Sequence, residues 1–456
     1  MCLNPNLGQA AYPEPPPPAD TTLYGHGIQR TLQKLARSSE ENGEVVRILF
    51  YGQSIIGQRW HTLVEEDLRR RFPDALLEVE NLALGGFSSQ RLVRTAPYDV
   101  LPYYPDLFVF HVFGNDVEYE QILRMVRAHT TAEILIQTDH ANFWPDDQGR
   151  RNKARWSRYM NDKFLPRMSE RYATALQPQQ AEWIEYLETH DMQPPALLAD
   201  NVHLNEHGRW LMAELLKRFL VLHPEATPEA AEWITTHPVG ADIRFEDRVL
   251  ELEFEGNRVE VLTAAPALET PPLSVTINGK QPSQYPQLHY HARPSRTPLI
   301  EWPAIKKIDA QAPLQSETWT LHVTDFNHDA SDFTFSLEGS VTGPDGAGKA
   351  SEDFVSDSGR VCIEARDWVF AYARSVGAKK NKGVWPESWT VTWQTTAVGL
   401  DAVPLVSGEP AWQVLASGLP AGTYSLRLKA LNEASEKSVF AVRVHRPPLM
   451  AGPIEN

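Results

Sequence analysis

The stretch VVRILFYGQS, residues 45–54, runs from a short apolar segment straight into a glycine and a serine. Its first seven residues (45–51) are rich in β-branched and aromatic side chains, which predicts a strand buried on both faces. Residues 58–71 follow with the periodicity of an amphipathic helix. A buried strand that leads into a helix is typical of an α/β protein with a parallel sheet.

The same alternation of apolar runs and amphipathic segments continues to about residue 222. The further predicted strands are 76–84, 106–113 (DLFVFHVF), 133–138 (EILIQT) and 181–187, and the further predicted helices are 29–37, 116–129, 151–175 and 206–222. The predicted fold class is therefore α/β, with a doubly wound parallel sheet that is covered by helices on both faces.

The second half of the chain has a different pattern. After about Pro238 the helical periodicity nearly vanishes, and short β-rich segments such as 249–254 (VLELEF) and 390–395 alternate with turn signals such as Asn278-Gly279. This predicts an all-β sandwich region of about 210 residues, as one large or two small domains. The predicted division is a Pro-rich N-terminal arm (1–43), an α/β domain (44–238) and the β-sandwich region (239–450).

Charge and cysteine content narrow the classes of partner. The net charge is −16, from 59 acidic and 43 basic side chains, which disfavours nucleic acid and anionic membranes. No run approaches the roughly 20 apolar residues of a membrane span. With Cys2 and Cys362 as its two cysteines, the chain has no disulfide framework. No secretion signal is visible, but Cys2 before a Pro-rich stretch also suits a processed lipoprotein, so cytoplasmic and exported locations both stay open.

Chemically useful residues follow the predicted strands. Gly52-Gln53-Ser54 ends the first strand, Asn81 to Gly86 (NLALGG) ends the second, and Gly114-Asn115-Asp116 ends the third; Asp200-Asn201-Val202-His203 precedes the last helix. In an open parallel sheet, ligands bind at the carboxyl ends of the strands. The topology therefore gathers a serine, glycine N–H groups, an asparagine amide and an Asp/His pair at one edge.

These residue types are those that acyl transfer requires. A serine hydroxyl is a weak nucleophile until an adjacent histidine takes its proton. The histidine needs a carboxylate behind it to fix its tautomer and to stabilise the imidazolium. The oxyanion that develops on the substrate needs preorganised donors, which a glycine N–H and an asparagine amide supply.

The four segments, in this order, resemble the SGNH (GDSL-like) serine hydrolase superfamily over about residues 45–222. The resemblance implies a flavodoxin-like fold, Ser54 as nucleophile, and Asp200 and His203 as the rest of a triad. It also implies an oxyanion hole made by the N–H groups of Gly86 and Ser54 and the amide of Asn115. Gly86 rather than Gly85 follows the spacing Asn-x4-Gly. Gln53 stands where the GDSL motif has Asp, a departure found in carbohydrate-directed relatives that weakens a lipase assignment.

Aromatic residues after the strand ends are candidates for substrate contact. Trp60, His140 and Trp144 could form walls of the site, because aromatic faces stack on sugar rings; the alternative is ordinary packing. The pair His203/His207 has the spacing of metal ligands on a helix, but no further ligand is evident. Gly343 to Lys349 imitates a phosphate-binding loop without the following Ser or Thr or a helix, which favours a β-turn. We therefore predict no metal and no cofactor.

The predicted function is a serine esterase that hydrolyses small acyl esters through an acyl-serine intermediate. The favoured substrate is an acetyl ester on a carbohydrate, from Gly52-Gln53-Ser54, the abundant aromatic residues and an appended sandwich that is typical of glycan-active enzymes; this last step is an analogy. The alternatives are a lipid or thioester hydrolase with the same triad, and a non-catalytic glycan-binding protein. The expected partner is a small-molecule or oligosaccharide ester; the sequence predicts no oligomeric state.

Overall fold

The computed structural model describes residues 12–449, apart from 229, 267–269 and 381–382. Its N-terminal half is built on a five-stranded sheet in the order β2-β1-β3-β4-β5, and every pairing in this sheet is parallel. The strands are β1 (Val45–Gly52), β2 (Leu76–Asn81), β3 (Leu107–His111), β4 (Glu133–Gln137) and β5 (Ala175–Gln177). The order is that of flavodoxin-like doubly wound folds, so the predicted fold class is confirmed.

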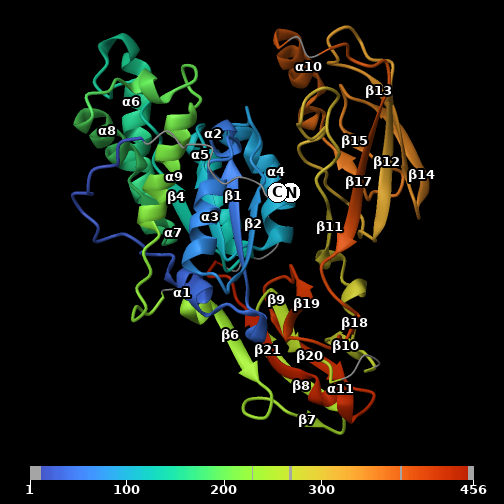
Figure 1. The fold of residues 1–456 in the computed structure, drawn as a ribbon. Coiled ribbons are helices and arrows are strands. Elements are labelled where there is room, and N and C mark those ends of the chain that lie inside the picture. The colour runs from blue at the N-terminus through green and yellow to red at the C-terminus, as the bar shows by residue number, and fades with distance from the viewer. Residues whose placement is uncertain (1–11, 229, 267–269, 381–382, 450–456) are drawn as a thin grey trace, which may run out of the picture.

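Helices cover both faces of this sheet (Figure 1). One face packs against α1 (Gln29–Arg37), α3 (His61–Arg71), α8 (Gln179–Thr189) and α9 (Glu206–Phe219). The other packs against α4 (Ser89–Tyr103), α5 (Asp116–His129) and α7 (Leu165–Tyr172). The strands β3 and β4 are buried at every position, which explains their continuous apolar runs. In the part of the chain that the structure describes, no helix is both long and apolar enough to cross a membrane.

The predicted fifth strand at 181–187 is wrong, because this segment lies inside helix α8. Trp183, Tyr186 and Leu187 are its buried apolar side chains, and their spacing of three and four residues is helical. The true edge strand is the three-residue β5 just before it. A strand of three residues carries too little alternation to stand out in sequence.

Two helical segments also differ from the prediction. The helical stretch predicted over 151–175 is present as an unbroken run over 151–172, but it contains a π-helical turn at Met160–Phe164 between α6 (Arg151–Tyr159) and α7. Helix α4 was not predicted. It contains Pro97 and Pro102, and internal prolines normally indicate that a helix ends.

The second half forms two separate apolar cores. The first, the sandwich unit, packs the sheet β18-β10-β20-β8-β7 on the sheet β19-β9-β21-β6. Its strands are β6 (Ile234–Pro238), β7 (Phe245–Glu246), β8 (Val249–Glu255), β9 (Arg258–Thr263), β10 (Leu273–Ile277), β18 (Ala402–Val403), β19 (Ala411–Ser417), β20 (Thr423–Lys429) and β21 (Val439–His445). The predicted antiparallel β region is thus present. The domain boundaries themselves stay a prediction.

The second core, the insert unit (residues 289–397), is formed by chain that leaves the sandwich unit after β10 and returns at β18. Its main sheet has the order β11-β17-β12-β13-β14. The elements are β11 (His289–His291), β12 (Glu317–Thr324), β13 (Thr334–Gly339), β14 (Gly343–Lys349), the pair β15 (Phe354–Val355) and β16 (Cys362–Ile363), helix α10 (Phe370–Lys379) and β17 (Trp389–Ala397). The segment predicted as a β-turn, Gly343 to Lys349, is strand β14, paired with β13.

The insert unit packs beside the parallel sheet (Figure 1). The sandwich unit lies beyond the amino ends of the parallel strands, where Thr131 contacts His445 and Tyr104 contacts Asn257. Arg293 of the insert unit forms a two-point ion pair with the buried carboxylate of Asp99 in α4, at 2.7 and 2.6 Å. The hydroxyl of Tyr98 donates to the carbonyl of Ile308 at 2.8 Å. Trp302 enters the core on this face of the sheet. The insert unit therefore adjoins the loops at the carboxyl end of the sheet.

Candidate functional site

Ser54 lies at the carboxyl end of β1, where the chain turns into the single-turn helix α2 (Ser54–Gly57). The turn requires a glycine at position 52. Its φ is 158°, and a Cβ there would lie 2.0 Å from the carbonyl oxygen of His111 on the neighbouring strand β3. The close approach of β1 and β3 therefore fixes where the chain bends and places the Ser54 hydroxyl at the edge of the sheet.

Ser54, His203 and Asp200 form one chain of hydrogen bonds. The Nε2 atom of His203 is 3.0 Å from Ser54 Oγ, and its Nδ1 is 2.8 Å from Asp200 Oδ2. The other carboxylate oxygen, Oδ1, accepts the backbone N–H groups of Val202 (2.7 Å) and His203 (2.8 Å). A carboxylate can only accept, so the Nδ1 atom carries the proton and Nε2 is free to accept from serine.

The same hydrogen bonds keep Asp200 ionised. The backbone N–H of His203, its imidazole and the backbone N–H of Val202 together lower the pKa of Asp200 to about 2. This occurs although the Asp200 side chain is 57% exposed, so hydrogen bonding rather than burial sets its charge. The negative charge behind the imidazole is therefore present throughout the neutral and mildly acidic range.

The loop that carries Asp200 and His203 is held by side chains from other strand ends. His140 Nε2 is 3.0 Å from the carbonyl oxygen of Val202, and Asn142 Nδ2 donates to that of Asn201 at 3.3 Å. Gln58, after α2, donates to the carbonyl of Leu204 and accepts its N–H, at 2.7 and 2.9 Å. The histidine is thus anchored on both sides relative to the serine.

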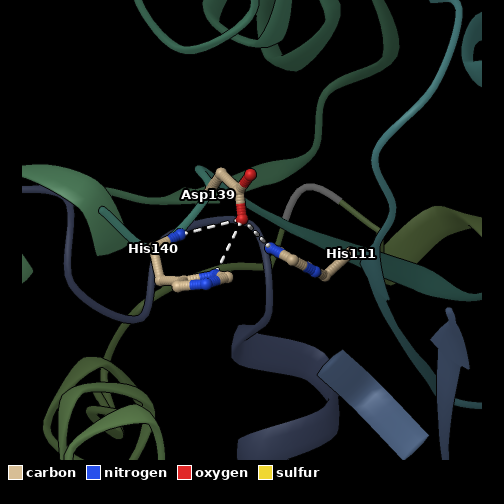
Figure 2. Close-up of side chains that lie close together, drawn as sticks. All are labelled: His111, Asp139 and His140. Atoms are coloured by element: carbon tan, nitrogen blue, oxygen red, sulfur yellow. Dashed lines mark hydrogen bonds and ion pairs between the residues drawn. The ribbon is translucent and has the colours of Figure 1, made fainter. Parts of the chain in front are cut away.

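His140 was weighed from the sequence as a substrate contact or as ordinary packing, and its burial supports packing. Its side chain is 3% exposed and packs edge-on against Trp183. Figure 2 shows His140 and His111 on either side of Asp139. Asp139 Oδ1 lies 3.1 Å from His111 Nε2 and 3.0 Å from His140 Nδ1. Burial would raise the pKa of Asp139, but the two histidines outweigh it and hold that pKa well below its usual range.

This cluster has the residue types of a metal site, since the three ligand atoms lie within 4.8 Å of one another. Hydrogen bonding explains it better. His111 Nδ1 is buried and has no hydrogen-bond partner among the described residues. A metal on Nε2 would place the proton on Nδ1, where no acceptor receives it. In the tautomer that donates from Nε2 to Asp139, Nδ1 carries no proton, so no buried N–H is left without an acceptor.

The predicted oxyanion residues Gly86 and Asn115 follow strands β2 and β3 respectively. Asn115 lies at the N-cap position of helix α5, is exposed, and its side-chain amide has no hydrogen-bond partner within the described part of the chain. A Cβ on Gly85 would lie 3.6 Å from Ser54 Cβ. Gly86 has φ +84°, and a Cβ there would lie 3.0 Å from the Trp302 ring. The loop therefore passes next to the serine, and the oxyanion roles of Gly86 and Asn115 stay a prediction.

The two predicted tryptophan walls differ in their surroundings. Trp60 is 1% exposed, donates its indole N–H to the carbonyl of Ile55 at 2.9 Å and packs edge-on against Phe50. It is a core residue, so of the two predicted roles, substrate contact and ordinary packing, the structure supports packing. Trp144 is partly exposed and donates to Gln193 Oε1 at 2.8 Å. A role for Trp144 in substrate contact stays a prediction.

One residue beside the site was missed in the sequence. Trp302, from the insert unit, donates its indole N–H to the carbonyl of Gly85 at 2.7 Å. Tyr372 stacks on the Trp302 ring, with centroids 4.7 Å apart, and the Arg91 guanidinium lies 4.2 Å from the Tyr372 centroid. No sequence signal links Trp302 to a loop more than 200 residues earlier. Trp302 contacts the loop next to Ser54 rather than Ser54 itself, so we expect it to position this loop.

Trp302→Phe should lower kcat for ester hydrolysis about tenfold with little change in KM. Phenylalanine keeps an aromatic ring but removes the hydrogen bond to Gly85, and a loss of roughly 1.4 kcal/mol corresponds to a factor of ten. Steady-state kinetics with nitrophenyl acetate measures both constants.

A matched control is Trp389→Phe. The Trp389 indole N–H also donates to a backbone carbonyl, at 3.0 Å, but its acceptor is Arg296 within the insert unit itself. This control should retain the wild-type constants. Equal losses in the two variants would mean that Trp302 only stabilises the insert unit.

No protein-family model matches the chain, and no curated protein matches it. Among solved structures, the match covers about 40% of the chain. An acetylxylan esterase from Geobacillus stearothermophilus has 20% identity over 42% of this chain and 99% of its own, with a TM-score of 0.34. An α/β hydrolase from the metagenome of Lake Arreo, Spain, has 20% identity over 38% of this chain and 94% of its own, with a TM-score of 0.34. The acetyl xylan esterase AlAXEase has 20% identity over 39% of this chain and 100% of its own, with a TM-score of 0.34. These likenesses concern the fold.

Proposed function

We propose that this chain is a serine esterase in which Ser54 is the nucleophile, His203 the general base and Asp200 its partner. The observation that carries the proposal is the unbroken hydrogen-bond chain from Ser54 Oγ through the imidazole to the Asp200 carboxylate. It lies at the carboxyl edge of a parallel sheet, where ligands bind in this class of fold. Geometry of this kind identifies an activated serine independently of its position in the sequence.

The reaction proceeds in two halves. His203 Nε2 takes the Ser54 proton as Oγ attacks the ester carbonyl carbon, and the resulting oxyanion accepts hydrogen bonds from the Asn115 amide and the N–H groups of Gly86 and Ser54. When the tetrahedral intermediate collapses, the imidazolium gives its proton to the departing alcohol and an acyl-serine is left. A water molecule, deprotonated by His203, then attacks the acyl carbon, and the Ser54 hydroxyl and a carboxylic acid are released.

The proposed substrate is a short acyl ester, in particular an acetyl ester on a carbohydrate. The side chains of His203 and Asp200 are 42% and 57% exposed, so the triad lies at an open surface. An open site suits a bulky alcohol part with a small acyl group. A long acyl chain would need an apolar channel to remove it from water.

A series of nitrophenyl esters tests this assignment. We expect kcat/KM to be highest for the acetate and to fall as the acyl chain lengthens to butyrate and octanoate. A protein with this preference should also release acetate from acetylated oligosaccharides. Preference for the longer chains would favour the lipid or thioester hydrolase, and oligosaccharide binding without turnover of any ester would favour the glycan-binding protein.

The dependence of kcat/KM on pH should show a single ionisation on its acidic side. Because the pKa of Asp200 is lowered to about 2, its carboxylate stays charged while the imidazole is protonated. On its acidic side, log kcat/KM should therefore decline with a slope of about one down to about pH 4, because the carboxylate does not titrate in that range. A slope of two in this range would mean that the carboxylate titrates with the base.

A further inference from the structure

A groove runs along one side of the loop that carries Asp200 and His203. It has a volume of about 690 Å³ and is bordered by Asn142, by the segment 148–153, and by Asn201 and Val202. The Asn142 amide donates to the Asn201 carbonyl, so the two walls meet there. Val202 immediately precedes His203 in the chain. A molecule lying in this groove would therefore contact the loop that carries His203.

The groove is positively charged in an acidic protein. Arg150, Arg151 and Lys153 border it, whereas the whole chain has a net charge of −16. No Asp or Glu is among the described residues that border the groove. The local charge thus has the opposite sign to that of the whole chain, which favours an anion at this place.

Two of these cations have no partner of their own. Arg150 lies 3.8 Å from Asp147 and over the ring of Phe143. Arg151 and Lys153 are exposed and form no ion pair or hydrogen bond through their side chains with any described residue. They are therefore available to a ligand from outside the chain.

We propose that this groove binds the carboxylate groups of an acidic oligosaccharide, such as one built from uronic acids, while an ester on a neighbouring sugar is at Ser54. The proposal rests on the esterase function above and specifies its substrate class. A guanidinium binds a carboxylate through two parallel hydrogen bonds, and an ammonium acts as a point charge. The amides of Asn142, Asn152 and Gln148 border the same groove and offer donors and acceptors for sugar hydroxyls.

A sugar acid fits better than a phosphate polymer. Two unpaired cations match a few carboxylates at separated positions. A nucleic acid presents a dense row of charges, and the net charge of −16 on the whole chain would repel it.

The test compares wild type with the double variant Arg151→Glu/Lys153→Glu. Initial rates of acetate release are measured on acetylated oligogalacturonate, which is anionic, and on neutral acetylated xylooligosaccharide of equal length. The ratio of kcat/KM for the anionic to the neutral substrate should fall about tenfold in the double variant, mainly through KM. Raising the salt to about 0.5 M should reduce the wild-type ratio, because rim charges are screened.

Lys280→Glu/Lys429→Glu is the matched control, since both lysines are exposed in the sandwich unit and the change in net charge is the same. Its ratio should equal that of wild type. The proposal would be overturned if Arg151→Glu/Lys153→Glu kept the wild-type ratio of kcat/KM values, or if the control variant lost as much of that ratio as the groove variant.

Binding separates this proposal from the esterase function. Calorimetry with unesterified oligogalacturonate should show binding to wild type that is about tenfold weaker in the groove variant, whether or not any ester is hydrolysed. Binding of equal strength in both proteins would reject the groove as the acid-binding site. Absence of ester hydrolysis by wild type would instead reject the esterase function.

Discussion

Replacing Ser54 by alanine should lower the rate of ester hydrolysis by about three orders of magnitude or more. The methyl group of alanine cannot form the acyl-enzyme, and His203 then has no hydroxyl to deprotonate. The residual rate acceleration in this variant comes from the oxyanion donors and from substrate binding, which contribute less. Acetate release and nitrophenyl acetate hydrolysis, measured on both proteins at the same concentration, give the ratio.

Ser331→Ala serves as the control for this substitution, because Ser331 is an exposed serine in the insert unit that bonds only to its neighbours Asp329 and Asn327. It should hydrolyse esters at the wild-type rate. Equal circular dichroism spectra and Tm values for Ser54→Ala and wild type would show that folding is unaffected. A Ser54→Ala protein with more than a tenth of wild-type activity would exclude Ser54 as the nucleophile.

Asp200→Asn should lower kcat by about three to four orders of magnitude. The two backbone N–H groups of Val202 and His203 both point at one oxygen, Oδ1. An asparagine would keep its carbonyl oxygen there and turn its NH₂ group toward His203 Nδ1. That nitrogen would then have to accept, the proton would move to Nε2, and the histidine could no longer take the Ser54 proton.

The control for this effect is Asp401→Asn. Asp401 is also a carboxylate that accepts a backbone N–H and a side-chain donor from one residue, Ser283, at 2.8 and 2.6 Å. It lies in the β region, and its amide variant should retain full activity. Asp200→Asn with kcat within tenfold of wild type would mean that the carboxylate does not set the tautomer of His203.

The elements that carry the site were predictable because their signals are local. Residues 45–52 form a strand because their apolar run is buried on both sides, and the glycine that ends it is required by the close approach of strand β3. Asp200 and His203 are three residues apart on one loop, so their pairing needs no long-range information. Ser54 and His203 are 149 residues apart, but the topology of a parallel sheet brings both to the same edge.

Contacts between distant segments were not predictable. His140 follows strand β4, as expected, but burial and the contact with the Val202 carbonyl make it a support of the catalytic loop rather than a wall of the site. Trp302 reaches Gly85 only because the insert unit folds back onto helix α4. The helix α8 was predicted as a strand because a short apolar segment has no decisive period of its own.

The β region shows the same distinction. Strands β8 and β17 were visible because each alternates between buried and exposed side chains. Strand β14 contains three glycines and a proline, which indicate a turn in sequence. It is a strand because β13 pairs with it. Helix α10 was hidden among β-rich segments, and its buried residues Phe370 and Ala373 pack onto the insert unit and the α/β core respectively.

Covalent labelling tests the central claim most directly. A fluorophosphonate ester reacts with an activated serine, whose oxygen bonds to phosphorus while fluoride leaves. Intact-mass spectrometry of the treated protein, followed by peptide mapping, should show one adduct per chain, on Ser54. Labelling should disappear in Ser54→Ala and fall strongly in Asp200→Asn. A protein that takes up no label, or carries it on another residue while Ser54 stays free, would contradict the assignment of Ser54 as an activated nucleophile.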